Sequence, residues 1–164
     1  MSVYKPVKTI EVFCWDRFVG GLAHDPKLDS HVFEYSPEWI NSGIELAPLH
    51  MPLRKGTYVF PQLSRATYYG LPAMIADSLP DDFGNAVIDA WLAEQGISKN
   101  EISSLDRLGY AGDRAIGALA FEPAQKNLNG PSTAIQLADV VAEARELLAR
   151  KAYSTTSSKS ALHI

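Results

Sequence analysis

The stretch from Leu71 to Trp91, LPAMIADSLPDDFGNAVIDAW, contains the most regular helical pattern in the chain. Apolar side chains recur there every three or four residues, the spacing that places them on one side of an α-helix. This apolar stripe consists of Phe83, Ala86, Val87, Ala90 and Trp91. We expect it to pack on a sheet, with Val87 and Trp91 in the protein core.

The predicted helix has signals at both ends. Pro80 suits a first-turn position, and the carboxylates of Asp81 and Asp82 favour the positive end of the helix dipole. Gly96 can adopt the left-handed conformation that ends a helix. Glycine inside a helix costs about 1 kcal/mol relative to alanine, so Gly84 indicates that another backbone packs close to it.

The residues before this helix predict an antiparallel sheet, because apolar and polar side chains alternate in short runs. Asp16 and Arg17 form a two-residue connection between the first two strands. Gly20 and Gly21 inside the second strand indicate a bulge or a close approach of another backbone. The predicted strands are residues 8–15 (KTIEVFCW), 18–24 (FVGGLAH) and 31–36 (HVFEYS).

Two further helices are predicted by their caps. Ser36 caps a short helix that ends at Gly43 and has Pro37 in its first position. Ser98 and Glu101 form a capping box, which opens a second helix. That helix should bury Ile102, Leu105 and Leu108 and end near Gly109 or Gly112, and a buried strand, AIGALAF, should follow over residues 115–121. Residues 44–69 do not predict a particular element.

These elements predict an α+β fold: an antiparallel, partly barrel-like sheet with two packed helices and a C-terminal helix after a linker. We expect a domain over residues 1–123, a linker over 124–133, a helix over 134–152 and a flexible tail over 153–164. The C-terminal helix has a capping box of Thr133 and Gln136. Its stripe is Leu137, Val140, Val141, Ala144, Leu147 and Leu148, and we expect it to dock on its own domain.

Composition is that of an ordinary globular protein, with 46% hydrophobic and 21% charged residues among 164. The single Cys14 excludes an internal disulfide, and no apolar run approaches the ~20 residues that span a bilayer. The N-terminus has no signal-peptide pattern, so we expect a cytoplasmic protein without membrane contact. A formal net charge of −4 gives no electrostatic basis for direct nucleic-acid binding.

Several groups of polar residues are candidates for functional sites. His50, Arg54 and Lys55 could form an anion site, although alternation predicts that Leu49, Met51 and Leu53 pack inward while the polar residues are solvated. Four acids, Asp77, Asp81, Asp82 and Asp89, lack the His or Cys partners of a metal site, and the helix start explains two of them.

The sequence also gives little support for a catalytic nucleophile or a phosphate-binding loop. Ser78 and Asp77 could join a histidine (His24, His31 or His50) in a triad, but no nucleophile-elbow motif is present. The spacing of Gly109, Gly112 and Gly117 fits turns and a strand entry better than a phosphate loop. Cys14 is interpreted as a core residue, and Trp39 and Trp91 as packing residues. We therefore assign no catalytic, cofactor-binding or metal-binding residue.

Five blocks of sequence, in order, resemble the N-terminal part of the HipA family, the serine/threonine kinase toxins of bacterial type II toxin-antitoxin systems. They are RFVGGLAHD (17–25), FEYSPEWINSG (33–43), LAPLHMPLR (46–54), ADSLPDDFGNAVIDAW (76–91) and LDRLGYAGDRAIGALAFEP (105–123). The resemblance implies the same α+β class. The phosphate-binding loop and catalytic acids of that family lie beyond the last residue of this chain.

The resemblance therefore implies a non-catalytic N-terminal domain, truncated before the catalytic lobe of a HipA-like kinase. The alternative is a stand-alone small protein that binds and restrains a separately encoded HipA-like kinase. Either reading implies two partners, a catalytic lobe in cis or in trans and a HipB-like DNA-binding antitoxin. ATP and Mg²⁺ are implied only for the full-length kinase, so this chain alone should have no enzymatic activity.

Overall fold

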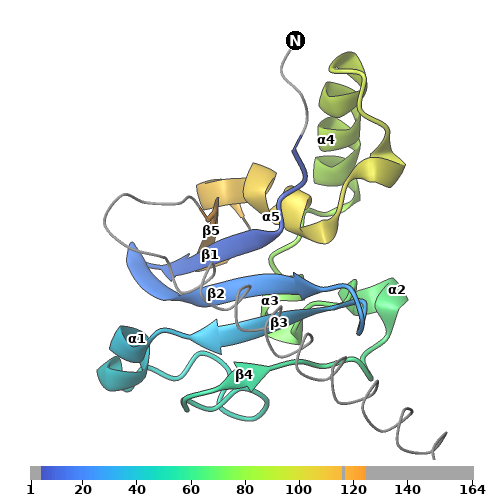
Figure 1. Ribbon diagram of the computed structural model, residues 1–164. Coiled ribbons are helices and arrows are strands. Elements are labelled where there is room, and N and C mark those ends of the chain that lie inside the picture. Colours follow the sequence, from blue (N-terminus) through green and yellow to red (C-terminus); the bar gives the residue numbers. More distant parts are fainter. Residues whose placement is uncertain (1–4, 116, 125–164) are drawn as a thin grey trace, which may run out of the picture.

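The computed structural model describes residues 5–115 and 117–124 (Figure 1). Five strands pair in the order β4-β3-β2-β1-β5, and every pairing is antiparallel. The strands are β1 (Thr9–Cys14), β2 (Arg17–Asp25), β3 (Ser30–Tyr35), β4 (Thr57–Tyr58) and β5 (Leu119–Pro123). The fold is therefore α+β, as predicted, with an open sheet whose edge strands are β4 and β5.

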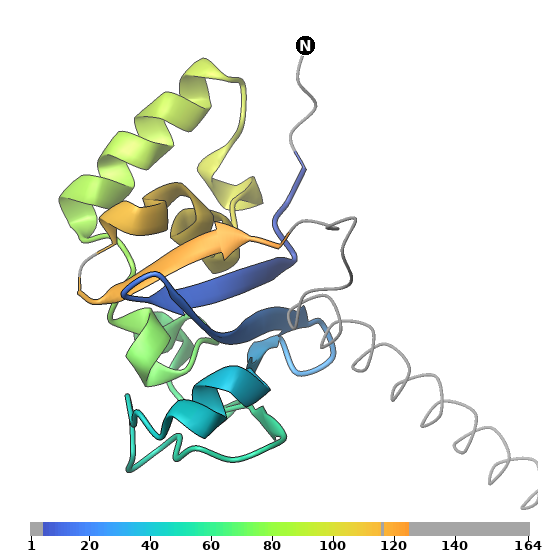
Figure 2. The same ribbon diagram turned by 90° about the vertical axis from the view of Figure 1, so that its left-hand side faces the viewer.

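Helices connect the strands and gather mainly on one side of the sheet (Figure 2). They are α1 (Pro37–Ser42), α2 (Arg65–Tyr68), α3 (Ala73–Ala76), α4 (Asp82–Glu94) and α5 (Ser104–Ala111), with the 3-10 helices η1 (Lys99–Glu101) and η2 (Gly112–Arg114). The predicted helix over 134–152, the tail over 153–164 and the linker beyond Ala124 lie outside the described residues.

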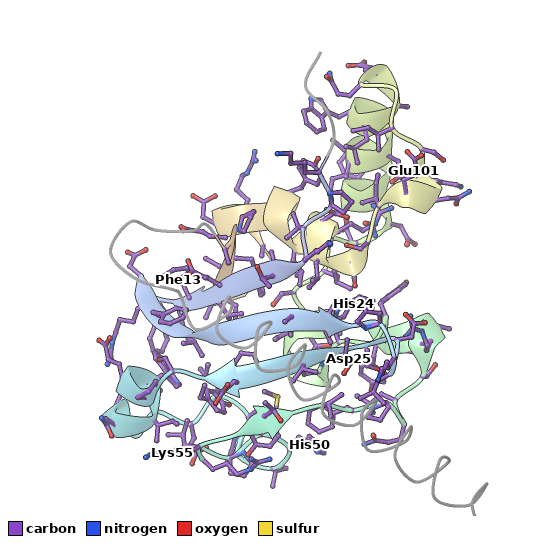
Figure 3. The ribbon with its side chains drawn as sticks, viewed as in Figure 1. Phe13, His24, Asp25, His50, Lys55 and Glu101 are labelled. Carbon is purple, nitrogen blue, oxygen red and sulfur yellow. The ribbon has the colours of Figure 1, made fainter. Side chains whose placement is uncertain are left out.

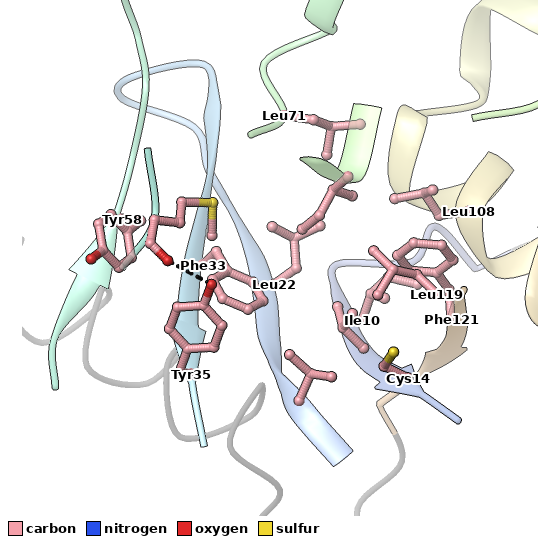
Figure 4. Close-up of a cluster of buried hydrophobic side chains, with 14 of the residues drawn as sticks. Ile10, Cys14, Leu22, Phe33, Tyr35, Tyr58, Leu71, Leu108, Leu119 and Phe121 are labelled. Carbon is pink, nitrogen blue, oxygen red and sulfur yellow. Dashed lines mark hydrogen bonds between the residues drawn. The ribbon is translucent and has the colours of Figure 1, made fainter. Parts of the chain in front are cut away.

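The core lies between the sheet and these helices (Figure 4). Ile10, Leu22 and Phe33 form one row across β1, β2 and β3, so their side chains share a face. Trp39 of α1, Ile75 of α3, and Leu105 and Leu108 of α5 join the same cluster. At the β4 side, the Tyr35 hydroxyl donates to the Met51 carbonyl oxygen at 2.8 Å, which satisfies a buried polar group.

The hairpin between β1 and β2 turns one residue earlier than predicted. Trp15 and Asp16 occupy the turn with φ of 49° and 60°, and Arg17 already pairs with Cys14. Positive φ at both central residues produces the twist that a two-residue hairpin needs. Alternation alone cannot locate this turn, because Trp15 fits the end of a strand equally well.

Gly20 confirms the predicted bulge and close backbone approach. Val12 pairs with Gly20 but Phe13 pairs with Phe18, so β2 carries one extra residue at this point. A Cβ atom at Gly20 would overlap the carbonyl oxygen of Glu34 in β3. Glycine is therefore required here for space.

Gly20→Ala should lower the free energy of unfolding by about 3 kcal/mol, the upper part of what overpacking costs, because the added methyl meets backbone that cannot move aside. Gly109→Ala in α5 is the matched control: its Cβ would meet Pro123 Cγ at 3.4 Å, an ordinary contact. Urea unfolding of both variants tests this. Equal stabilities would show that β2 and β3 can separate to accept the methyl group.

Caps determine the short helices largely as predicted. Ser36 accepts from the Trp39 backbone N–H at 3.1 Å, and Gly43 ends α1 with φ of 72°. The Ser98–Glu101 capping box exists but opens only η1. The longer helix α5 starts later, at a second capping box of Ser103 and Asp106, so Ile102 precedes it. It buries Leu105 and Leu108 and ends at Gly112, as expected.

Asp106 has a role beyond its cap. The residue is 1% exposed, and its carboxylate accepts from the Ser103 backbone N–H and hydroxyl, both at 2.8 Å. It also accepts from the Val7 backbone N–H at 2.8 Å. This one side chain therefore fastens the start of α5 to the segment that enters β1.

The strand predicted over residues 115–121 begins later, as β5 at Leu119. Gly117 has φ of 107°, outside the range of a regular strand. Leu119 and Phe121 point into the core, whereas Glu122 and Pro123 are exposed. Ala115, Gly117 and Ala118 therefore precede the strand instead of belonging to it.

Helix α4 forms in the predicted region, but the prediction that its apolar stripe packs on the sheet is wrong. Phe83, Val87 and Trp91 are 78%, 53% and 48% exposed. We call these three residues the α4 stripe. The main contacts of the helix among the described elements are with α5 and η1, and it stands away from the body of the domain (Figure 1).

Polar contacts decide which side of α4 faces inward, and hydrophobic periodicity in the sequence does not detect such contacts. Arg107 of α5 donates to Asn85 Oδ1 at 2.9 Å and to Asp89 Oδ1 at 2.8 Å, which turns that side of the helix inward. Leu92, on the same side, is fully buried. Apolar residues occur on more than one side of α4. With the side of Asn85, Asp89 and Leu92 turned inward, the larger side chains of the α4 stripe remain exposed.

The structure differs from the predictions for α4 in the position of Pro80 and in the surroundings of Gly84. Asp81 caps the helix and accepts from the Gly84 backbone N–H at 2.8 Å, so Pro80 precedes the cap instead of lying in the first turn. Gly96 follows the last turn with φ of 77°. The atoms nearest a Cβ at Gly84 are Pro80 Cβ and Asp81 Oδ1, at 3.0 and 3.3 Å, so no distant backbone within the described part of the chain packs there.

Trp91→Ala should therefore lower the free energy of unfolding by only about 1–2 kcal/mol, since it removes a half-buried ring and one aromatic pair. Leu108→Ala, at a fully buried position, should cost about 2–5 kcal/mol. Denaturation midpoints of the two variants provide the comparison. If both changes cost the same, Trp91 belongs to the core.

Candidate functional site

The first candidate site is the α4 stripe and the surface beside it. The Trp91 ring meets Tyr110 of α5 edge-on, with ring centroids 5.4 Å apart. Next to Val87 lies a hollow of about 360 Å³, whose lining includes Gly84, Tyr110 and Arg114. Large apolar side chains grouped on a rigid helix are typical of protein-binding surfaces. The site can therefore bury apolar area against a partner.

The second candidate is a hollow of about 450 Å³ at one end of the sheet, which we call the histidine hollow. His24 of β2 and His31 of β3 are cross-strand neighbours whose ring centroids lie 5.0 Å apart. Figure 3 shows His24 at this end, beside Asp25. The rest of the lining includes Lys8, Asp29, Arg65, Tyr69, Ser103 and Ser104.

His31 joins three elements in this hollow. Its backbone N–H donates to the Gly70 carbonyl oxygen at 2.8 Å, and its Nε2 lies 2.9 Å from Ser104 Oγ at the start of α5. The residue is 5% exposed. Burial, followed by the nearby positive groups His24 and Arg65, lowers the pKa of His31 to about 4. The ring is therefore neutral at physiological pH.

The Ser104–His31 pair resembles two members of a nucleophilic triad, but it is better explained as structure. His31 Nδ1 has no hydrogen-bond partner in the described part of the chain, so no acid orients the ring. A base with a pKa near 4 is also too weak to activate a hydroxyl at neutral pH. The pair ties α5 to β3.

The polar residues that are candidates in the sequence do not assemble into sites. Arg54 lies over the Tyr58 ring, 3.9 Å from its centroid, and donates to the Thr57 carbonyl oxygen at 3.1 Å. His50, labelled in Figure 3, lines a separate hollow whose other walls are mostly apolar. Met51 and Leu53 pack inward as predicted, but Leu49 does not, being 90% exposed.

The acids are divided among structural tasks. Asp77 ends α3, Asp81 caps α4, Asp82 lies in its first turn and Asp89 pairs with Arg107 at 2.8 Å. Over residues 5–115 and 117–124, no three His, Cys, Asp or Glu side chains are grouped so that they could hold a metal ion. No described helix has the length and apolar character needed to cross a membrane.

Ser78 and the histidines lie in different hollows. Ser78 is buried beside α4 and lines the hollow next to Val87, where no histidine is part of the lining. Gly112 and Gly117 have positive φ and serve turns, and Gly109 lies inside α5. Cys14 is fully buried, and burial raises the pKa of its thiol, which confirms its assignment to the core. Trp39 is also a core residue.

Sequence comparison adds the family. A family model described as the HipA N-terminal domain matches residues 10–122, which include every strand except the first residue of β1 and the last of β5. The chain belongs to the HipA N-terminal domain family. No curated protein matches the chain.

The HipA N-terminal domain thus includes both candidate sites almost entirely. The matched residues contain the whole α4 stripe, and only Lys8 and the neighbouring Pro6 and Val7 of the histidine hollow precede them. Periodicity detected the apolar residues of α4 but not their exposure. Ser104, Arg65 and Lys8 were missed because only the tertiary fold brings them to His31.

The buried neutral state of His31 predicts a pH dependence of stability. His31 binds a proton more weakly in the folded state than in the unfolded chain, where its pKa is near 6.5, so its contribution is complete above that value. As pH falls from about 7.5 to about 5, it should reduce the free energy of unfolding by about 2 kcal/mol.

His31→Gln keeps a hydrogen-bonding side chain and removes this titration. Urea unfolding of both proteins at several pH values isolates the contribution of His31 as the difference between the two curves. Parallel curves would show that His31 becomes charged in the folded protein without cost.

Proposed function

We propose that this HipA N-terminal domain is a protein-interaction module of a HipA-like serine/threonine kinase toxin in a toxin-antitoxin system. It contributes a binding surface to the catalytic lobe and no catalytic group. The observation that carries the proposal is the α4 stripe, because three large apolar side chains on one helix are held away from the domain's own core.

The chemistry of the stripe suits a protein partner. Aromatic residues dominate the binding energy of many interfaces, and Phe83 and Trp91 are both aromatic. Arg107 holds α4 through Asn85 and Asp89, so the side chains are presented on a fixed helix. A pre-positioned surface loses little conformational entropy on binding. Asp81 and Asp82 add an acidic margin at the start of the helix, which favours a basic region on the partner.

The same surface serves two arrangements. The catalytic lobe can follow on the same polypeptide, or a separately encoded HipA-like kinase can be bound and restrained by this domain. ATP and Mg²⁺ belong to the lobe in either case, and a HipB-like DNA-binding antitoxin is the further partner expected in the cytoplasm. In both arrangements the domain binds the catalytic lobe through the α4 stripe.

Binding should be measured by calorimetry between this chain and a HipA-like catalytic lobe that lacks its own N-terminal domain. Phe83→Glu should weaken the complex about 30-fold or more, as expected when a central aromatic contact worth about 2 kcal/mol is replaced by a charge. Leu49→Glu is the matched control, since Leu49 is exposed on a different part of the surface.

Circular dichroism spectra of both variants should be unchanged, because neither side chain is buried. Equal affinities for Phe83→Glu and Leu49→Glu would exclude the α4 stripe from the interface. Absence of binding by the unmodified chain would contradict the proposed function itself.

A further inference from the structure

The face of the sheet opposite the main core carries apolar residues of its own. All helical side chains of the main core cluster pack on the face that carries Ile10, Leu22 and Phe33. The opposite face has its own apolar group of Ala23, Val32 and Val59, which we call the outer cluster. No described helix contributes a side chain to it.

The outer cluster is unlike a water-facing surface. Ala23 and Val32 lie directly opposite each other on β2 and β3 and are 2% and 5% exposed. On the same face, Phe13 and Phe18 pair with ring centroids 5.6 Å apart. The exposed face of an antiparallel sheet normally carries polar side chains at alternate positions. On this face Glu11 and Glu34 lie one row away from Ala23 and Val32, so the outer cluster is a covered apolar patch beside a polar row.

The path of the chain identifies what can cover this face. The Ala124 backbone N–H donates to the Thr9 carbonyl oxygen at 3.1 Å. Thr9, Ala23 and Val32 form one row across β1, β2 and β3. The chain therefore leaves the sheet in the row that contains the outer cluster.

The length of the following chain is sufficient. Residues 125–133 can span about 30 Å when extended, whereas β1 and β3 are separated by about 10 Å, two strand spacings. The sequence of residues 134–152 has apolar residues at helical spacing, including Leu137, Val141, Ala144 and Leu148. Such a helix is marginal in water unless its apolar side is packed.

We propose that residues 134–152 form a helix that packs its apolar side on the outer cluster, across β2 and β3. The sheet then lies between two helical layers. This contact is intramolecular and leaves the α4 stripe, on α4 beyond the opposite face, available for a partner. The proposed packing of residues 134–152 is independent of the proposed function.

Hydrogen–deuterium exchange of the full chain tests the proposal. Amides of residues 137–148 should exchange about ten-fold or more slowly than in an unstructured peptide. Val32→Glu places a charge in the outer cluster and should abolish that protection. Val87→Glu, on the α4 stripe, is the matched control and should leave it intact.

A second variant addresses the possibility that Val32→Glu unfolds the sheet. Val141→Glu combined with Leu148→Glu alters only the covering segment and should increase carbene labelling of the peptide that contains Ala23 and Val32. Unprotected amides in the unmodified chain, protection lost only in Val87→Glu, or unchanged labelling in the double variant would overturn the proposal. So would protection that disappears on dilution to a monomer, because a second copy would then be the covering element.

Discussion

The carboxylate of Asp106 connects the two halves of this fold. It accepts hydrogen bonds from Ser103 at the start of α5 and from Val7, which leads into β1. A buried carboxylate is tolerated because several donors satisfy it, and removal of those donors would leave a costly charge. This contact sets α5 on the sheet, so Leu105 and Leu108 reach the core cluster. Arg107, between them, then positions α4. The position of the α4 stripe therefore depends on the cap formed by Asp106, the residue next to Arg107.

Local signals predicted the parts of the fold that depend on neighbouring residues. Ser36, Pro37 and Gly43 predicted α1 from end to end, because capping is a contact over three or four residues. The bulge at Gly20 was likewise visible in sequence, although its cause, the Glu34 carbonyl oxygen, comes from another strand. The starts of α5 and β5 were shifted, since two capping boxes and several glycines compete within twenty or so residues.

Properties that depend on distant contacts could not be predicted. The side of α4 that faces inward is decided by Arg107, an interaction across 18 residues or more, and the larger apolar side chains misled the periodicity argument. The histidine hollow brings together β2, β3, α2 and the start of α5, and no spacing in the sequence marks it. Cys14 was easier, because strand alternation alone placed it on the buried face.

The position of Cys14 has a practical consequence for measuring motion in this domain. The residue pairs with Arg17 of β2 on one side and with Leu119 of β5 on the other, so it lies on a central strand with a neighbour on each side. It is the only thiol in the chain. Alkylating reagents can reach it only when β1 separates from a neighbour or the core opens, and they react with the thiolate that burial disfavours. The alkylation rate of the unmodified protein therefore reports how often the sheet opens, without an introduced label.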